Sequence, residues 1–291
     1  MTELNSPLKE SELVLNSDGS VYHLELLPED IGQTIILVGD PDRVERVSSH
    51  FDSVILRKQK REFITHTGIL NNVKLTVLST GIGTDNIDIV LNELDALANI
   101  DLKTGTIKSE LTSLNIVRIG TSGSMQVDID IDESVVSTYG LGLDSLMNHY
   151  KITYTQSESD YALALSGELD IPYLHPYLVS ASPILLKKFA GFKSGVTATC
   201  SGFYAPQGRQ LRAAPNYPDI IDKLTHFKKD GLIITNFEME TAAIYGLSRM
   251  LGHHALSINA IMANRILKKF SKHPHLTVEL TIRKVLEILT Q

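Results

Sequence analysis

Cysteine and positive charge are both scarce in this chain. Its 291 residues include a single cysteine, Cys200, so no internal disulfide can form, as is usual in a reducing compartment. A lone cysteine is most often a small buried hydrophobic residue, and we do not expect Cys200 to be catalytic. The 27 Lys and Arg residues are outnumbered by 34 Asp and Glu residues, which gives a net charge of −7. This balance argues against nucleic-acid binding, which requires a clustered surplus of positive charge.

Long apolar runs are also missing. None approaches the ~18 to 20 residues that a membrane helix needs, and the N-terminus lacks the basic and then apolar pattern of a signal peptide. Hydrophobic residues nevertheless make up 43% of the chain, enough for a sizeable core. We therefore expect a soluble, cytoplasmic protein that has no membrane partner.

Short apolar runs alternate with amphipathic helical patterns along most of the chain. The runs predict strands at 34–39, 73–80, 114–123, 231–235 and 255–265. The amphipathic patterns predict helices at 40–51, 84–99, 236–252 and 277–290. This alternation is typical of an α/β protein whose mostly parallel or mixed sheet is covered by helices on both faces.

The chain shows no internal repeat and no Pro/Gly-rich linker, so we expect one domain over residues 21–291. Residues 1–20 are polar without a clear period, which indicates a flexible N-terminal arm. Two stretches are ambiguous. Residues 100–113 are polar and lengthen a helix-to-strand connection, and residues 152–170 fit either an irregular excursion or a short helix.

Glycine and arginine occur together after several predicted strands. Gly39 is followed by Arg43, residues 80–83 read TGIG, and Arg118 is followed by Gly120. Ligands of parallel α/β sheets bind beyond the carboxyl ends of the strands, where glycine lets the backbone approach and arginine matches an anion. Arg43 taken alone is best interpreted as a solvated helix residue. Arg118 interrupts an apolar strand, so we expect it to meet a bound anion or a buried acid.

Seven short motifs carry further information. They are GDPDRVE (39–45), REF (61–63), STGIG (79–83), RIGTSG (118–123), GFYAPQGR (202–209), NFEME (236–240) and NR (264–265). In this order and combination they resemble the uridine-cleaving members of the nucleoside phosphorylase-I family, over roughly residues 20–285. The resemblance implies a single-domain three-layer sandwich with a mixed, partly barrel-like central sheet flanked by helices.

The same resemblance implies a pentosyltransferase of nucleoside salvage or catabolism. Such an enzyme uses phosphate to split uridine into the free base and ribose 1-phosphate, with deoxyuridine and thymidine as further candidate substrates. Phosphate itself attacks C1′, so the protein contributes positioning and electrostatics rather than a nucleophile.

The family's functional residues carry over onto matching positions of this chain. For phosphate binding the resemblance implies Gly39, Arg43, Arg118 and Thr121, with Arg61 entering from a neighbouring subunit. For ribose binding it implies Thr121, Met239 and Glu240, with His23 reaching across the same interface. For base binding it implies Phe203, Gln207, Arg209 and Arg265. The implied catalytic residues are Arg118, Glu240 and Arg209.

No organic cofactor and no metal centre are expected, and inorganic phosphate is a co-substrate. Glu62 matches a ligand of the monovalent cation that the family holds at a subunit interface, but Asn86 stands where a typical member has serine. Residues borrowed from a neighbour require at least a homodimer. A hexamer, built as a trimer of dimers, is the alternative, although the lengthened segment 100–113 lies in the half of the fold that forms subunit contacts.

Two other functions stay open. One is a purine nucleoside phosphorylase or a nucleosidase of the same family, and the other is a non-catalytic nucleoside-binding protein. Purine-cleaving relatives carry Ser-Asp where this chain has Asn264 and Arg265, which favours pyrimidines. Hydrolytic relatives tend to lack the phosphate arginines that this chain keeps, which favours phosphorolysis.

The stretch NFEMETAA contains two acids, Glu238 and Glu240, two positions apart. On the predicted helix their side chains would point about 200° apart and could not share a ligand, whereas on an extended chain they would align. No His or Cys lies beside them, so a metal site is not expected. The resemblance makes Glu240 the carboxylate that binds the ribose hydroxyls and leaves Glu238 as a supporting acid.

Overall fold

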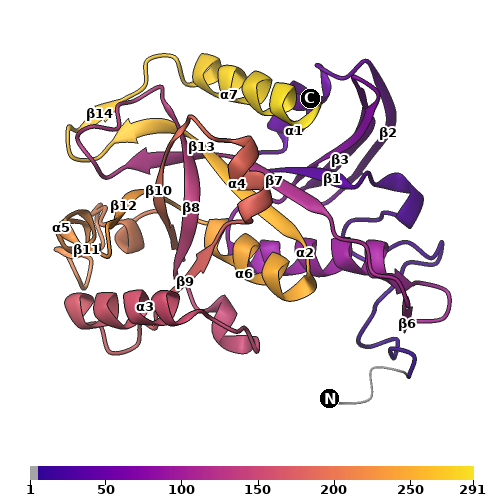
Figure 1. The fold of residues 1–291 in the computed structure, drawn as a ribbon, viewed down its shortest axis with the longest axis horizontal. Helices are drawn as coiled ribbons and strands as arrows, with labels where there is room; N and C mark the ends of the chain where they lie inside the picture. Colours follow the sequence, from indigo (N-terminus) through magenta and orange to yellow (C-terminus); the bar gives the residue numbers. More distant parts are fainter. Residues whose placement is uncertain (1–5) are drawn as a thin grey trace.

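In the computed structural model, which describes residues 6–291, twelve strands form one mixed sheet (Figure 1). In chain order they are β1 (Thr34–Val38), β2 (Ser53–Lys60), β3 (Phe63–Leu70), β4 (Val73–Ser79), β7 (Asn115–Ser124), β8 (Ser134–Leu143), β9 (Tyr177–Ser180), β10 (Lys193–Cys200), β11 (Lys228–Lys229), β12 (Leu232–Glu238), β13 (His254–Asn264) and β14 (Lys269–Phe270). The helices are α1 (Asp42–Ser48), α2 (Thr84–Asn99), α3 (Gln156–Leu169), α4 (Pro183–Lys188), α5 (Ile220–His226), α6 (Thr241–Leu251) and α7 (Pro274–Leu289).

The sheet curls back on itself around β7. Its strand order is β11-β12-β10-β8-β13-β7-β1-β4-β3-β2, and β12 also pairs with the end of β7, where Asn236 lies opposite Ser124. Strands β7, β12, β10, β8 and β13 therefore form a closed ring, while β1, β4, β3 and β2 continue as an open sheet. The predicted α/β fold with a mixed, partly barrel-like sheet is confirmed.

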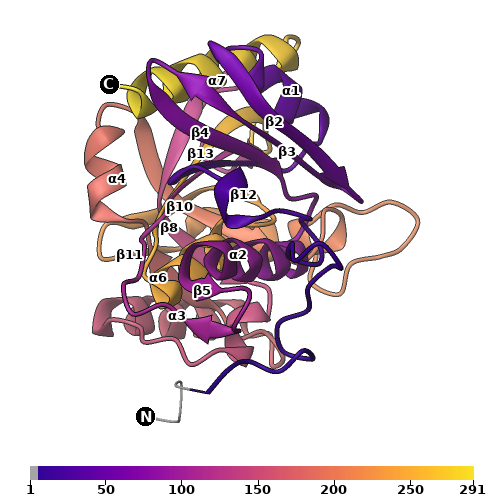
Figure 2. The same cartoon turned by 90° about the vertical axis from the view of Figure 1, so that its right-hand side faces the viewer.

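Helices cover both faces of this sheet. Figures 1 and 2 show α1 and α7 on one side and α2, α3 and α6 on the other. The predicted helix over 84–99 is α2 with the same bounds. A buried apolar stripe anchors this helix, as expected for a helix with a single core-facing side. The stripe consists of Ile87, Val90, Leu91, Leu94 and Leu97.

The predicted helix over 236–252 is wrong at its beginning. Residues 236–238 belong to β12, and α6 begins only at Thr241. Asn236 and Phe237 have strand partners on both sides, in β10 and β7. This pairing extends the strand because unpaired backbone groups are costly inside a closed barrel.

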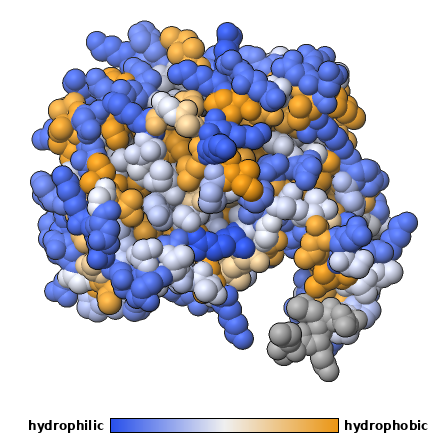
Figure 3. All heavy atoms as spheres, viewed as in Figure 1, coloured by the Kyte–Doolittle hydropathy of each residue, from blue (hydrophilic) through white to orange (hydrophobic). Residues whose placement is uncertain are grey.

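The two ambiguous stretches fold into regular structure. Residues 100–113 contain a small hairpin of β5 (Ile100–Asp101) and β6 (Thr106–Ile107), and residues 152–170 contain α3. In Figure 3, hydrophilic and apolar side chains are intermixed over the face seen in Figure 1. Within residues 6–291, no helix combines the length and the apolar character needed to cross a membrane.

The predicted N-terminal arm, residues 1–20, lies partly outside the described residues. From residue 6 on it lies against the domain. The backbone N–H of Leu8 donates to Gly105 in the β5–β6 hairpin, and Lys60 donates to the side chain of Asn16. The lone cysteine, Cys200, is buried at the end of β10, and this burial raises the pKa of its thiol to about 12. A thiol of that kind stays protonated at neutral pH, which fits the expectation that Cys200 is not catalytic.

A buried carboxylate, Glu158, fixes the beginning of α3. It accepts hydrogen bonds from the backbone N–H groups of Thr155 and Ser180, and Arg249 of α6 donates to both of its oxygens. Burial by itself raises the pKa of Glu158. The hydrogen bonds from Arg249 and the backbone outweigh that effect, so the pKa lies below its ordinary value of 4.5.

Glu158→Gln is expected to lower the unfolding free energy at pH 7 by roughly 2 kcal/mol, because it removes charge-assisted hydrogen bonds. Since the folded-state pKa is depressed, the stabilising effect of the carboxylate is complete above the ordinary pKa and is lost as the pH falls through the folded-state value. The melting temperatures of wild type and variant, measured by calorimetry from pH 7 downwards, should therefore converge below about pH 4.5. A constant difference across this range would contradict the assignment.

Candidate active site

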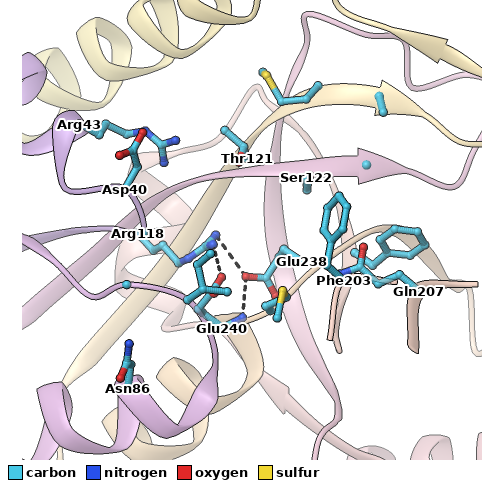
Figure 4. Close-up of a pocket in the computed structure, with 18 of the residues that line it drawn as sticks. Asp40, Arg43, Asn86, Arg118, Thr121, Ser122, Phe203, Gln207, Glu238 and Glu240 are labelled. Carbon is cyan, nitrogen blue, oxygen red and sulfur yellow. Dashed lines mark hydrogen bonds and ion pairs between the residues drawn. The ribbon is translucent and has the colours of Figure 1, made fainter. Parts of the chain in front are cut away.

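A cavity of ≈ 740 Å³ lies at the carboxyl-terminal ends of β1, β7, β12 and β13. This is the edge of the sheet at which ligands bind in α/β folds. Figure 4 shows three groups among its labelled side chains. Asp40 and Arg43 lie at one end, Arg118 with Glu238 and Glu240 lies in the middle, and Phe203 and Gln207 lie at the other end.

Arg118 of β7 is the centre of the cavity and is only 4% exposed. Its Nη1 donates to Asn259 of β13 at 2.8 Å and lies 3.2 Å from Glu238, while its Nη2 donates to Glu240. Burial would lower the pKa of Arg118, but the two carboxylates raise it above its ordinary value. The prediction that Arg118 meets a buried acid is confirmed, and the structure supplies two.

Glu238 and Glu240 reach the same guanidinium because the chain bends between them. Glu238 is the last residue of β12, and Glu240 is the residue before α6. Glu240 also accepts a hydrogen bond from the backbone N–H of Gly83 at 2.8 Å. Burial is the main reason that its pKa is raised. The expectation that the two acids point apart on a helix is therefore wrong.

Arg43 of α1 supplies a second buried cation at one end of the cavity. It is 8% exposed, so its interpretation as a solvated helix residue is wrong. Its Nη1 donates to the backbone oxygen of Ile119 at 3.2 Å, while its Nε is buried without a hydrogen-bond partner among the described residues. Burial and then repulsion from Arg118 lower its pKa to about 10. Both effects favour an anion at this end, because an anion would compensate them.

The opposite end of the cavity combines an amide, a guanidinium and aromatic rings. The guanidinium of Arg209 lies 3.8 Å from the ring centre of Phe203 and donates to Oε1 of Gln207 at 2.6 Å. Gln207 is only 3% exposed. Burial and then repulsion from Arg265 lower the pKa of Arg209 to about 10. Such a group can stack on a flat ring and donate hydrogen bonds to its edge.

Most of the predicted site residues line this cavity together. They are Gly39, Arg43, Arg118, Thr121, Phe203, Gln207, Arg209, Met239 and Glu240. Arg265 lies behind the lining and donates to the backbone oxygen of Gln207 at 3.2 Å. Their roles toward phosphate, ribose and base stay predictions.

The two residues expected to serve a neighbouring subunit lie outside the cavity of their own chain. His23 packs against α2, where its Nδ1 lies 2.6 Å from Glu93. Arg61 is exposed at the turn between β2 and β3, and its guanidinium lies over the ring of Tyr22, 5.8 Å from the ring centre. Their participation in a shared site also stays a prediction.

The expected interfacial cation has no complete site among the residues that the structure describes. Glu62 accepts a hydrogen bond from the side-chain amide of Asn86 at 3.3 Å, so Asn86 presents a donor to it rather than a ligand. Among residues 6–291, no three His, Cys, Asp or Glu side chains are grouped to hold a metal ion. These residues alone do not fit a cation, and the cation stays a prediction about an interface.

The sequence alone does not single out several residues of the cavity. Phe237, Met262 and Phe270 are apolar lining residues whose positions follow from the ends of β12 and β13 and from β14. Asn259 is a partner of Arg118 that could have been found, because it is a polar residue inside the apolar run of β13. A buried amide in such a run usually has a specific partner.

A family model described as the phosphorylase superfamily matches residues 33–290 of the chain. The chain belongs to this family. The family resemblance predicted from the seven motifs is thus confirmed.

Individual relatives of this phosphorylase are similar over most of their length. A uridine phosphorylase of Thermococcus kodakarensis is 27% identical over 277 residues, which cover 94% of this chain and 88% of the relative. A DeoD-type purine nucleoside phosphorylase of Listeria welshimeri is 29% identical over 237 residues, which cover 81% of this chain and 84% of the relative. Among solved structures, a Trypanosoma brucei nucleoside phosphorylase superposes with a TM-score of 0.88 at 28% identity and covers 95% of this chain and 99% of its own. The family match and these relatives show that the protein is an enzyme of the pentosyltransferase class.

Proposed function

We propose that this phosphorylase splits uridine with inorganic phosphate into uracil and ribose 1-phosphate. The observation that carries the proposal is one cavity with two buried arginines, Arg43 and Arg118, at one side and an amide–guanidinium pair, Gln207 and Arg209, at the other. The first pair suits an oxyanion and the second suits a flat polar ring. Two carboxylates lie between them.

The arginine side of the cavity would bind and orient phosphate. Over residues 6–291 the Nε of Arg43 has no partner, and Arg118 has N–H groups beyond those that face Asn259, Glu238 and Glu240. Both arginines therefore have donors for an anion. A phosphate oxygen would attack C1′ as the C1′–N1 bond breaks. Its negative charge would also stabilise the cationic sugar of the transition state.

The carboxylate of Glu240 is suited to a ribose that carries two adjacent hydroxyls. It already accepts from Gly83 and Arg118, which fixes its direction, and a carboxylate has further lone pairs for hydroxyl donors. Uracil leaves with the electrons of the broken bond and takes up a proton. Donation from Gln207 and Arg209 would stabilise the negative charge on the departing ring.

The base end of the cavity favours a pyrimidine over a purine. Purine cleavage calls for an acid that protonates the ring. Of the acidic lining residues, Asp40, Glu238 and Glu240 are not at this end, and Glu62 is hydrogen-bonded to Asn86. The side chain of Asn264 is buried and bonded to backbone groups, so it does not face the base. A solved relative is described as showing uridine phosphorylase activity, which supports the same choice. Deoxyuridine and thymidine are further candidate substrates.

The proposal is tested by incubating the enzyme with uridine, with and without phosphate, and following the ultraviolet absorbance change on base release. We expect release only when phosphate is present, because phosphate is the nucleophile. Uridine that stays intact with phosphate would refute the proposal, and equal cleavage without phosphate would identify a nucleosidase. Faster release from inosine than from uridine would identify a purine nucleoside phosphorylase, and the Listeria relative makes this arm necessary.

We further propose a cytoplasmic homo-oligomer, at least a dimer, in which His23 and Arg61 complete the neighbouring site. Both lie outside the cavity of their own chain and Arg61 is exposed, which leaves it available to a second subunit. A trimer of such dimers is the alternative assembly. Sedimentation velocity separates the two, and a fully active monomer would contradict both.

A further inference from the structure

The carboxylate of Glu238 contacts four other residues at the centre of the cavity. Its carboxylate lies at the beginning of α6, where it accepts from the backbone N–H groups of Glu240 and Thr241 at 3.0 to 3.1 Å. Thr199 of β10 donates to it at 2.8 Å, and Arg118 lies 3.2 Å away. The residue is 4% exposed and that small surface faces the cavity (Figure 4). Glu238 thus joins a helix end, two strands and the central guanidinium.

The first consequence concerns which N–H groups of Arg118 remain free. Its Nη1 is held between Asn259 and Glu238, and its Nη2 donates to Glu240. With three acceptors around it, the planar guanidinium has one orientation, and its remaining N–H groups have one direction. Without Glu238 the guanidinium would keep two of these partners and would be free to turn about them.

The second consequence concerns Glu240. Glu238 accepts the backbone N–H of Glu240 and so fixes the bend that brings the side chain of Glu240 back toward Arg118 and Gly83. A single carboxylate therefore sets the positions of both charged groups in the middle of the cavity. Precise placement of such groups matters, since an error of about 1 Å in a reactive arrangement can reduce the rate by about 10²-fold.

We propose that Glu238 is a positioning residue for catalysis, acting through Arg118 and Glu240 without touching the substrate. This inference rests on the proposed phosphorolysis and assigns Glu238 a role that the motif resemblance leaves open. Its charge also has a distinctive effect. Because Glu238 is an anion 3.2 Å from Arg118, one of the two arginines proposed to bind phosphate, its attraction for Arg118 comes with repulsion of phosphate.

These two effects of Glu238 predict an unusual kinetic signature. Glu238→Gln loses the orienting charge, so kcat should fall by about 10²-fold. The same change removes a negative charge near the anion, so KM for phosphate should stay level or decrease. A merely structural role predicts no fall in kcat per folded molecule, because partial unfolding lowers the observed rate only in proportion to the folded fraction and leaves KM unchanged.

Glu158 provides a matched control for this experiment. It too is a buried glutamate, 2% exposed, that holds a helix beginning and pairs with an arginine, but it lies outside the cavity. Glu158→Gln should lower thermal stability and leave kcat and both KM values within twofold of wild type. Both variants are assayed with uridine and phosphate, well below their melting temperatures, and rates are normalised to folded protein measured by circular dichroism.

A kcat for Glu238→Gln at least about thirtyfold below that of Glu158→Gln, with no rise in KM for phosphate, supports the proposal. Equal kinetics of the two variants would overturn it, and so would a rise in KM for phosphate at unchanged kcat. Should Glu238→Gln not fold, Glu238→Asp keeps the charge and shortens its reach, and a wild-type kcat in that variant would also overturn it. A wild-type enzyme that does not cleave uridine would refute the proposed function instead, so the two failures are distinct.

Discussion

Arg118→Ala is expected to reduce kcat/KM for uridine phosphorolysis by at least ~10²-fold, because it removes the guanidinium that we propose orients the attacking phosphate. The same change leaves Glu238 and Glu240 buried side by side without their cation. Two such carboxylates repel each other, and one of them is expected to take up a proton. The loss should therefore appear in kcat as well as in KM for phosphate, and steady-state kinetics with both substrates measures it.

The stability of the Arg118→Ala variant needs its own control. Removing one partner of a buried ion pair typically costs roughly 3–5 kcal/mol, so part of an activity loss could reflect unfolding. Arg249→Ala is the matched variant, because it removes the cationic partner of the buried Glu158, an ion pair that lies outside the cavity. Arg249→Ala should be less stable but active. Near-normal turnover in folded Arg118→Ala would exclude Arg118 from the active site.

Gly120→Ala is expected to have a comparable effect without changing any charged residue. A Cβ at position 120 would lie 1.8 Å from Nη1 of Arg118 and 2.5 Å from Oδ1 of Asn259. No real contact is so short, so the guanidinium must leave the place in which three acceptors hold it. We expect kcat/KM to fall by at least ~10²-fold and stability to fall by about 1–3 kcal/mol, as in other overpacked interiors.

Gly167 of α3 offers the matched glycine control for this variant. A Cβ there would meet nothing within 4 Å, and alanine is a better helix former than glycine. Gly167→Ala should leave turnover unchanged and raise the unfolding free energy by about 0.5–1 kcal/mol. If Gly120→Ala turned over uridine at the wild-type rate, the arrangement around Arg118 would have no bearing on catalysis. A structure of that variant would then show where the guanidinium has moved.

Local patterns in the sequence predict the elements that carry their own signal. The apolar stripe of α2 has helical spacing over sixteen residues, and its bounds agree with the structure. Arg118 could be assigned a buried partner because an unpaired cation inside an apolar strand is costly. Both inferences depend only on neighbours along the chain. The strands without a predicted counterpart, such as β2 and β8, have mixed or interrupted apolar patterns.

The parts that the sequence does not predict depend on distant pairing. Residues 236–238 have a helical pattern together with α6, but pairing with β7 and β10 makes them a strand. That change turns two acids that would diverge on a helix into two ligands of one guanidinium. The burial of Arg43 has a similar origin, since α1 packs against β3 and β4 and brings it to the backbone of Ile119. Neither the strand conformation of residues 236–238 nor the burial of Arg43 can be predicted from short-range periodicity.

The position of β13 within the closed ring has a consequence for how this enzyme is made. β13 is the last long strand in the chain, yet it lies between β7 and β8 in the sheet. Arg118 also lacks its ion-pair partner Glu240, which lies 122 residues later in the chain, until that residue has been synthesised. During synthesis, β7 therefore emerges with a charged side chain and an open edge that only the final quarter of the chain can cover. Until β13 has been synthesised, the nascent chain exposes an unpaired strand edge that is prone to aggregation. This is the stage at which chaperone binding would protect the chain most.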